Sequence, residues 1–372
     1  MNSNNKKNTL FQRWLLPGFL FQSVIIGGGY ATGRELVEFF LSVGPLGGLI
    51  SILTVTVTFS FVLAIAFELS RVTRTFDYRT FFKQILGPGW FVYEIVYVAL
   101  VMLVIAVLGA ASGELVSSRL GLPPITGTVT MVAIIGILVF YGTPVIEKAL
   151  AGWSFLLYAV YAVMLWAFLS KFGHKIPAVL ATDDLSGPWV MGTVKYVGLT
   201  ATAVTMILFC VRHMESRRDA FVAGALAGPI GMLPAIVFLL GMIASYPEIL
   251  EVAVPADYMM QQLDFGWITL IFYIVVFGTF IETGTGMIHA VNERIDHTFL
   301  ERSRQMPRWL RPAVAMFILF FAVVLADRIG IIDLIAKGYV ALAWIFLGIF
   351  VIPLLTIGVW RISRTAPEQH QR

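Results

Sequence analysis

Long apolar runs separated by short polar segments dominate the chain. Ten such runs can be read from the sequence, at about 14–41, 45–69, 88–112, 125–141, 149–169, 189–212, 220–244, 265–290, 309–326 and 333–360. A helix needs roughly 20 apolar residues to cross a bilayer. The runs do not alternate apolar and polar positions as barrel strands do, and backbone groups in lipid must be satisfied within each segment. The pattern therefore predicts an all-α integral membrane protein with about ten transmembrane helices.

Composition supports this interpretation. Hydrophobic residues make up 58% of the 372 residues and charged residues only 13%, whereas soluble domains carry about 25% charged residues. The net charge of +4 comes from clusters between the apolar runs, so it does not indicate nucleic-acid binding. The expected partners are a lipid bilayer and a small-molecule solute, and the pattern gives no signal for an oligomeric state.

The distribution of Lys and Arg predicts the orientation, because cytoplasmic loops are enriched in both. If the N-terminus is cytoplasmic, 19 of the 26 Lys and Arg residues lie in cytoplasmic segments. Both termini are then cytoplasmic, which requires an even number of spans. The polar start runs into a long apolar segment without a cleavage site, so we expect an uncleaved first helix.

Three pairs of landmarks suggest an internal repeat. Arg34-Glu35 with Gly44-Pro45 returns as Arg218-Asp219 with Gly228-Pro229, Asp77-Tyr78 with Gly89-Trp90 returns as Asp257-Tyr258 with Gly266-Trp267, and Glu147 with Gly152-Trp153 returns as Asp333 with Gly338-Tyr339. The offset spans five helices. Because five is odd, the second copy must lie inverted relative to the first, which is typical of secondary transporters.

We therefore expect four segments along the chain. They are a cytoplasmic N-terminal tail at 1–13, a first five-helix repeat at 14–170, a second and inverted five-helix repeat at 187–360, and a cytoplasmic C-terminal tail at 361–372. A duplicated helix bundle without a transport role would also explain the repeat, but not the broken helix predicted below.

The first helix carries three consecutive glycines near its middle, Gly27, Gly28 and Gly29, followed by Tyr30 and Thr32. Each glycine costs about 1 kcal/mol in a helix interior. A break here frees carbonyl and N–H groups, and the N–H end suits an anionic group such as a carboxylate. These five residues are therefore predicted to bind substrate. The alternative is close helix packing through small residues.

Two further helices contribute candidate substrate contacts. The sixth helix, the repeat mate of the first, has Thr200 and Thr202 near its middle but no glycine run, so a break there is a weaker prediction. Its hydroxyls could face a ligand or bond their own helix. Tyr97 on the third helix is a candidate, and Glu94 one turn earlier could reach the interface instead.

The eighth helix carries a carboxylate, Glu282, well inside its apolar span, with Thr279 and Thr283 nearby. A carboxylate in the membrane interior is a functional candidate by default. An acid with two hydroxyls suits H⁺ or Na⁺, because hard cations prefer oxygen ligands. We predict an ion-coupling site here, with a structural hydrogen bond of Glu282 as the alternative. The sequence shows no Cys/His metal spacing, nucleophile elbow or phosphate loop, so no enzyme, cofactor or resident metal is expected.

The stretch from Gly27 to Glu35, together with Arg212-His213 and Gly228-Pro229, resembles the YkvI-like family of bacterial membrane proteins. That family resembles the amino acid–polyamine–organocation transporter superfamily. The resemblance implies a leucine-transporter type of five-plus-five fold in the bacterial plasma membrane. It also implies a symporter of an amino acid or similar small organic solute, with substrate between the first and sixth helices. A membrane sensor that binds a ligand in the same fold without transporting it is the alternative.

The same resemblance implies a gate, because the outer parts of the first and tenth helices approach when such a fold closes. Arg34 on the first helix is costly in a membrane unless paired. We predict that it pairs with Asp333 of the tenth helix in the closed state, with Glu38 at i+4 as the local alternative partner.

Overall fold

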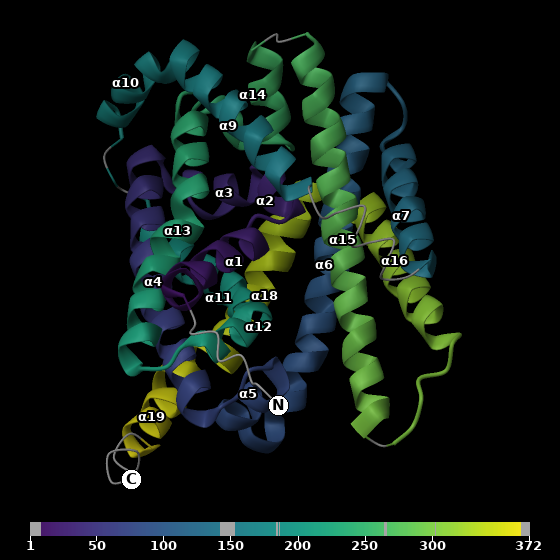
Figure 1. The fold of residues 1–372 in the computed structure, drawn as a ribbon. Helices are drawn as coiled ribbons and strands as arrows, with labels where there is room; N and C mark the ends of the chain where they lie inside the picture. The colour runs from purple at the N-terminus through teal and green to yellow at the C-terminus, as the bar shows by residue number, and fades with distance from the viewer. Residues whose placement is uncertain are drawn as a thin grey trace.

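The computed structural model describes residues 9–141, 153–183, 185, 187–263, 266–301 and 303–365. These residues are almost entirely helical, as Figure 1 shows. In chain order the α-helices are α1 (Leu16–Ile25), α2 (Gly28–Thr32), α3 (Arg34–Phe39), α4 (Pro45–Thr73), α5 (Tyr78–Leu86), α6 (Phe91–Leu120), α7 (Pro124–Tyr141), α9 (Trp153–Phe172), α10 (Ile176–Ala181), α11 (Trp189–Thr200), α12 (Val204–Ile207), α13 (Arg217–Ile243), α14 (Pro255–Leu263), α15 (Trp267–Glu301), α16 (Leu310–Ile329), α17 (Ile331–Asp333), α18 (Val340–Phe346) and α19 (Val359–Thr365). Short 3-10 or π-helical segments connect or extend them: η1 (Phe11–Leu15), η2 (Leu41–Val43), η3 (Gly87–Trp90), η4 (Gly173–Lys175), η5 (Ala201–Ala203), η6 (Leu208–His213), η7 (Glu248–Glu251), η8 (Leu334–Tyr339), η9 (Leu347–Val351) and η10 (Leu354–Gly358).

Within the described residues, 8 helical segments are long and apolar enough to cross a membrane. The helix at Pro124–Phe140 is apolar but shorter, and the first apolar run is divided among α1, α2 and α3. Large apolar side chains such as Phe317 and Phe320 face outward at 56% and 63% exposure, as expected of a surface that meets lipid. The prediction of a multi-pass, all-helical membrane protein is confirmed, while the count of ten spans stays a prediction.

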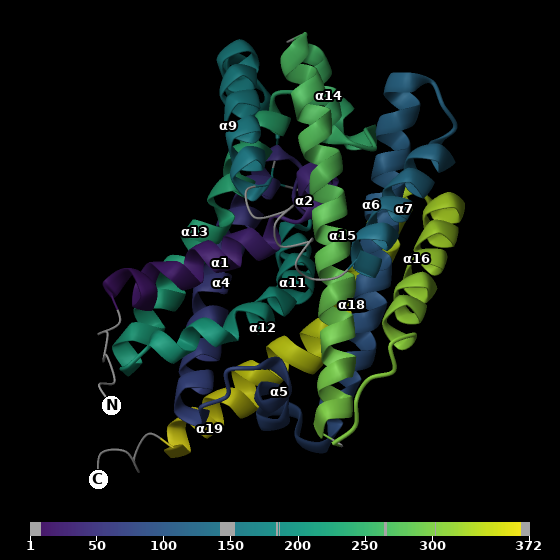
Figure 2. The same cartoon turned by 45° about the vertical axis from the view of Figure 1, so that its right-hand side comes forward.

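The helices run between two ends of the molecule. Both Figure 1 and Figure 2 show α14 at one end and α5 and α19 at the other. Arg79 of α5 pairs with Glu301 at a distance of 2.7 Å, which places the end of α15 at the α5 end. The Lys and Arg pattern predicts that the α5 end is cytoplasmic. Residues 1–8 and 366–372 of the two predicted tails lie outside the described residues.

The α4 and α13 helices lie side by side and pack along each other (Figure 1). Small residues of α13 permit this approach, because an added Cβ at Gly224 would overlap the backbone of Ala64, and one at Gly228 would overlap the carbonyl of Thr56. Close backbone approach at small residues is typical of membrane helix interfaces.

One landmark of the predicted repeat is wrong as a structural equivalence. Gly44 has φ of 98° and precedes Pro45 at the start of α4, whereas Gly228 and Pro229 lie inside α13. Gly44-Pro45 allows a sharp turn into the start of α4, whereas Gly228 allows α13 to pack closely against α4.

The positions of the second landmark pair agree better with an inverted repeat. Asp77 is the N-cap of α5, and Asp257 lies in the first turn of α14 at the opposite end. Gly89 and Gly266 lie just before α6 and α15. Part of the third landmark, Glu147 to Gly152, lies outside the described residues. The inverted repeat therefore stays a prediction.

Candidate functional site

The first helix is broken where the glycine run predicts it. α1 ends at Ile25, Ile26 leaves the helical conformation with ψ of 62°, and Gly27 is extended with ψ of −176° before α2 begins. A second bend follows at Gly33, whose φ of 79° lies in the left-handed region that favours glycine. The predicted discontinuity of the first helix is confirmed, and the chain turns twice within one membrane crossing.

Side chains satisfy the carbonyls near these bends. The Thr32 hydroxyl donates to the Gly29 carbonyl at 2.6 Å and accepts the Arg34 N–H at 3.1 Å. The Tyr161 hydroxyl of α9 donates to the Ala31 carbonyl. Thr32 was predicted as a substrate contact, but it is fully buried and its hydroxyl holds the second bend instead.

The break opens into a cavity of about 980 Å³. Its walls come from α1, α2, α3, α5, α6, α9, α11, η5, α12, η6, α15 and η8. The predicted substrate and ion-site residues that line it are Gly27, Gly29, Tyr30, Tyr97, Thr200, Thr202, Glu282 and Thr283. Gly28 begins α2 between two of them. Predicted residues from four separate parts of the sequence therefore meet around one space.

The cavity follows one face of α15 toward the α5 end. Glu282, Gly286, His289, Glu293 and His297 all line it. The first and last of them are 15 positions apart, or about 22 Å at 1.5 Å per residue. His289 therefore lies on the cavity wall, between Glu282 and the α5 end of the molecule.

The two threonines beside Glu282 face different surroundings. Thr283 lies opposite the break, since an added Cβ at Gly27 would be 3.5 Å from its Cγ2. Thr279 does not line the cavity: it is buried, donates to the Val275 carbonyl at 2.8 Å and accepts from the Trp153 indole at 3.2 Å. Thr279 therefore lies apart from the cavity wall that Glu282 and Thr283 share, and its part in an ion site stays a prediction.

The sixth predicted helix is irregular. α11 passes through the 3-10 segment Ala201–Ala203 into α12, and Ile207 at the end of α12 leaves the helical conformation with φ of −112° and ψ of 3° before the 3-10 segment η6. The Thr202 hydroxyl donates to the Leu199 carbonyl at 2.9 Å. Thr200 and Thr202 line the cavity, and a functional break in the sixth helix stays a prediction.

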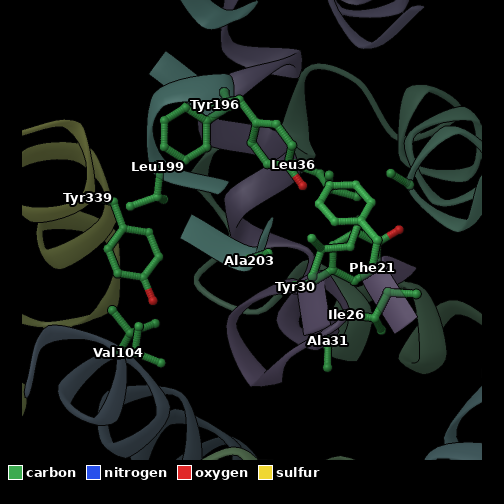
Figure 3. Close-up of a cluster of buried hydrophobic side chains, with 14 of the residues drawn as sticks. Phe21, Ile26, Tyr30, Ala31, Leu36, Val104, Tyr196, Leu199, Ala203 and Tyr339 are labelled. Atoms are coloured by element: carbon green, nitrogen blue, oxygen red, sulfur yellow. The ribbon is translucent and has the colours of Figure 1, made fainter. Parts of the chain in front are cut away.

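Aromatic side chains surround the break. Figure 3 shows Tyr339 of η8 projecting toward Val104 of α6, with Leu199 and Ala203 nearby. Tyr30 and Tyr97 line the cavity with 3% and 0% exposure, and neither hydroxyl has a hydrogen-bond partner among the described residues. Buried hydroxyls without partners are rare in native proteins, so these two are available to a ligand.

Sequence reasoning missed Glu35 as a site residue. It follows the bend at Gly33, and its carboxylate returns toward the break: an added Cβ at Gly29 would overlap Glu35 Oε1 and lie 3.4 Å from the Tyr339 hydroxyl. Glu35 lines the cavity and takes part in none of the ion pairs found among the described residues. The position of Glu35 in the interior of an apolar run was the available sequence signal.

A second missed residue, Arg294, lies at the α5 end of the cavity. Its guanidinium lies 3.8 Å from the ring centre of Tyr78 and 3.7 Å from that of Tyr97, and it pairs with Glu94 at 3.3 Å. Glu94 therefore has a partner on α15 instead of reaching the interface. The stacking on two rings and the ion pair together hold Arg294 in place where α6 and α15 meet.

The predicted gate pair is not formed. Arg34 is 4% exposed and pairs with Glu38 at 3.3 Å, the local alternative. Its guanidinium also donates to the carbonyls of Leu250 at 2.6 Å and Val252 at 3.2 Å. Asp333 instead pairs with Lys337 at 3.0 Å on its own helix. Arg34 therefore ties the first helix to the segment between α13 and α15.

That segment closes the α14 end above the break, and we call residues 247–263 the lid. An added Cβ at Gly33 would lie 2.9 Å from the Phe238 ring and 3.1 Å from Pro255, so the lid packs directly on the second bend. Asp257 fixes the lid to α6 and α15: it pairs with Arg119 at 2.8 Å and accepts a hydrogen bond from Tyr273. The cavity thus extends from the break toward the α5 end.

No family model matches the chain, and no curated protein matches it. Among solved structures, a mutant of the manganese transporter of Eremococcus coleocola matches with a TM-score of 0.52 and 14% identity, covering 95% of this chain and 81% of the other. A Na⁺-coupled sialic acid symporter in a substrate-bound outward-open state matches with a TM-score of 0.50 and 12% identity, covering 93% and 86%. At this identity the likeness shows a shared fold. Within the residues that the structure describes, no group of three His, Cys, Asp or Glu side chains is placed to hold a metal ion.

Proposed function

We propose that the protein is a secondary transporter that moves a small organic solute across the membrane by alternating access. The observation that carries the proposal is the position of the break. Gly27 and Gly29 of the broken helix line a cavity of about 980 Å³ that runs toward one end of the molecule, while the lid covers the other end. A site near the middle of the bilayer, beside a discontinuous helix, is the arrangement that secondary transporters use.

The two neighbouring transporters share the fold, and their coverage of nearly the whole chain supports the proposal. The resemblance to the YkvI-like family and its superfamily points to an amino acid or similar solute. We further propose that Glu282 couples transport to H⁺ or Na⁺, because it lies beside Thr283 opposite the break. Ion and solute would then bind on either side of the same glycine run.

Uptake into proteoliposomes tests the proposal. Purified protein is reconstituted, and a panel of labelled amino acids, amines and Mn²⁺ is offered under an inward H⁺ or Na⁺ gradient. We expect accumulation of an organic solute that stops when the gradient is dissipated. Gly27→Leu should abolish it, because the new side chain would meet Thr283 and enter the cavity.

Gly89→Leu is the matched control, since an added Cβ at Gly89 meets no atom within 4 Å. Saturable binding of a panel member without uptake would instead support the membrane sensor. Accumulation of Mn²⁺ alone would overturn the proposal that the transported solute is organic.

A further inference from the structure

The α7 and α16 helices lie side by side at the edge of the helix bundle (Figure 2), and a groove of about 620 Å³ runs between them. Every residue that lines the groove is apolar. Small residues of α7 leave the space, because Ala133 and Gly136 both line it and an added Cβ at Gly136 would lie 3.5 Å from Leu319 Cδ1. We propose that this groove binds an acyl chain of an anionic phospholipid from the leaflet at the α5 end of the molecule.

The position of the groove along α16 fits an acyl chain rather than a headgroup. The residues of α16 that line it lie on one face of the helix: Met316, Leu319, Phe320 and Val323. At 1.5 Å per residue, they lie about 9 to 20 Å from the start of α16 at Leu310. Half of the hydrocarbon core of a bilayer is about 15 Å thick. The groove therefore lies at the depth of the acyl chains and reaches the centre of the bilayer.

The segment before α16 carries the charge that an anionic headgroup needs. Arg304 and Arg308 are exposed there and belong to none of the ion pairs of the described residues. Arg311, by contrast, pairs with Glu293 at 3.1 Å and Asp296 at 3.0 Å. Two guanidinium groups are thus available near the end of the groove, and the donor fork of arginine matches the oxygens of a phosphate.

Trp309, between Arg308 and α16, is placed as a membrane-interface residue. Its side chain is 68% exposed, and tryptophan is enriched at the level of the headgroups. This start of α16 lies at the α5 end, because Arg311 holds it to the last turns of α15. The Lys and Arg pattern predicts that this end is cytoplasmic, and the cytoplasmic leaflet carries anionic lipids.

A second copy of the chain is the other candidate occupant of an apolar groove. Two copies paired about a two-fold axis normal to the membrane would present the same patch at the same depth. The Arg304 and Arg308 side chains of both copies would then approach each other, and like charges placed together oppose association. The same arginines attract a phosphate, so the charge favours the lipid.

Two lipids with identical acyl chains test the proposal: phosphatidylglycerol, which is anionic, and phosphatidylethanolamine, which is zwitterionic. The purified protein in detergent is titrated with each lipid, and native mass spectrometry counts the lipids bound per chain. We expect saturable binding of one phosphatidylglycerol and weaker binding of phosphatidylethanolamine. Thermal unfolding gives a second measurement, because a ligand that binds only the folded protein raises its stability.

Gly136→Leu should remove the saturable binding of both lipids, because the new side chain extends toward Leu319 and fills the groove. Gly348→Leu is the matched control. Gly348 is an exposed glycine of η9 outside the groove lining, and an added Cβ there meets no atom within 4 Å. Size-exclusion chromatography with light scattering checks that both variants stay folded and reports their oligomeric state.

Arg308→Glu tests the headgroup without changing the groove. It changes the charge by two, and each charge near an anionic surface contributes about a 5-fold preference, so phosphatidylglycerol should bind about 10- to 30-fold more weakly. The affinity for phosphatidylethanolamine should change much less. Arg364→Glu is the matched control, because Arg364 is an exposed arginine of α19 at the same end of the molecule.

Equal affinities for the two lipids would overturn the proposal, as would binding of many lipids without saturation. Unchanged phosphatidylglycerol affinity in Gly136→Leu or in Arg308→Glu would also contradict it. A parent protein that is a dimer, with Gly136→Leu a monomer that still binds phosphatidylglycerol, would assign the groove to a second copy. None of these measurements involves solute uptake, so their failure would leave the proposed transport function standing.

Discussion

Removal of the Arg34 side chain should release the lid. Arg34 connects the first helix to the lid through two hydrogen bonds, to the carbonyls of Leu250 and Val252 at 2.6 and 3.2 Å. Hydrogen bonds from charged groups contribute about 1.5–3 kcal/mol each. Once the lid lifts, water can donate to both carbonyls in place of Arg34. We therefore use the lower value of about 1.5 kcal/mol for each of the two hydrogen bonds, so that Arg34 favours the closed lid by about 3 kcal/mol. At about 1.4 kcal/mol per tenfold change, Arg34→Met should raise the population of the open lid about 100-fold.

Cysteine labelling measures this change. The native Cys210 is fully buried and is replaced by alanine, and a cysteine is introduced at Ala256 of α14, which is also fully buried. A membrane-impermeant maleimide is added from the α14 side. We expect Arg34→Met to speed labelling about 100-fold and Arg34→Lys, which keeps the charge but loses the fork of donors, to speed it less.

Arg328→Met is the control, because Arg328 is exposed near the end of α16 and belongs to none of the ion pairs of the described residues. A labelling rate in Arg34→Met equal to that of the control would refute the argument that Arg34 holds the lid.

Three further predictions concern topology, coupling and stability. Cysteines at the exposed positions Glu248 and Arg304 should be labelled from opposite sides of the membrane, and labelling from one side would contradict the orientation. Glu282→Gln should remove the ion dependence of solute affinity while the protein stays folded, and unchanged ion dependence would make Glu282 structural. Asp257→Ala should destabilise the protein by about 1–3 kcal/mol in thermal unfolding, because the buried carboxylate that it removes accepts hydrogen bonds from Arg119, Tyr273 and Gln261. Asp333→Ala should cost less than about 1 kcal/mol, because its pair with Lys337 is exposed, and equal effects would argue against burial as the cause.

The membrane-spanning segments and the break at Gly27 could be predicted because each depends on local properties. Apolar length determines which segments can cross a bilayer, and three glycines oppose a continuous helix wherever they occur. The site residues near the break, such as Tyr30 and Thr283, followed from the same local signals. They line the cavity because the break brings the first and eighth helices together.

Glu35 and Arg294 were missed because their positions in the site depend on tertiary geometry. On a single outer half-helix, Glu35 would lie two turns beyond Gly27, away from the break. The left-handed turn at Gly33 folds α3 so that Glu35 returns to Gly29. The sequence around Gly33 does not predict that turn, because glycine is also common at packed helix crossings.

Thr279 and Arg34 show the same limit of sequence-based prediction, because their partners come from distant parts of the chain. Thr279 shares a helix face with Thr283 in the sequence, but the indole of Trp153 meets it from α9. Arg34 finds its partners in carbonyls of a segment more than 200 residues away. Backbone partners cannot be recognised from residue types, so the resemblance led to Asp333, and only the local alternative Glu38 is found as a partner.

Access to the cavity from both sides of the membrane tests alternating access most directly, because it needs no known substrate. A cysteine replaces Met287, which lines the cavity, in the chain without Cys210. An impermeant maleimide is applied to right-side-out and to inside-out vesicles, with and without Arg34→Met. We predict labelling from the α5 side in the parent chain, and from the α14 side at a rate that Arg34→Met increases. Labelling from one side only in both backgrounds would contradict a transporter.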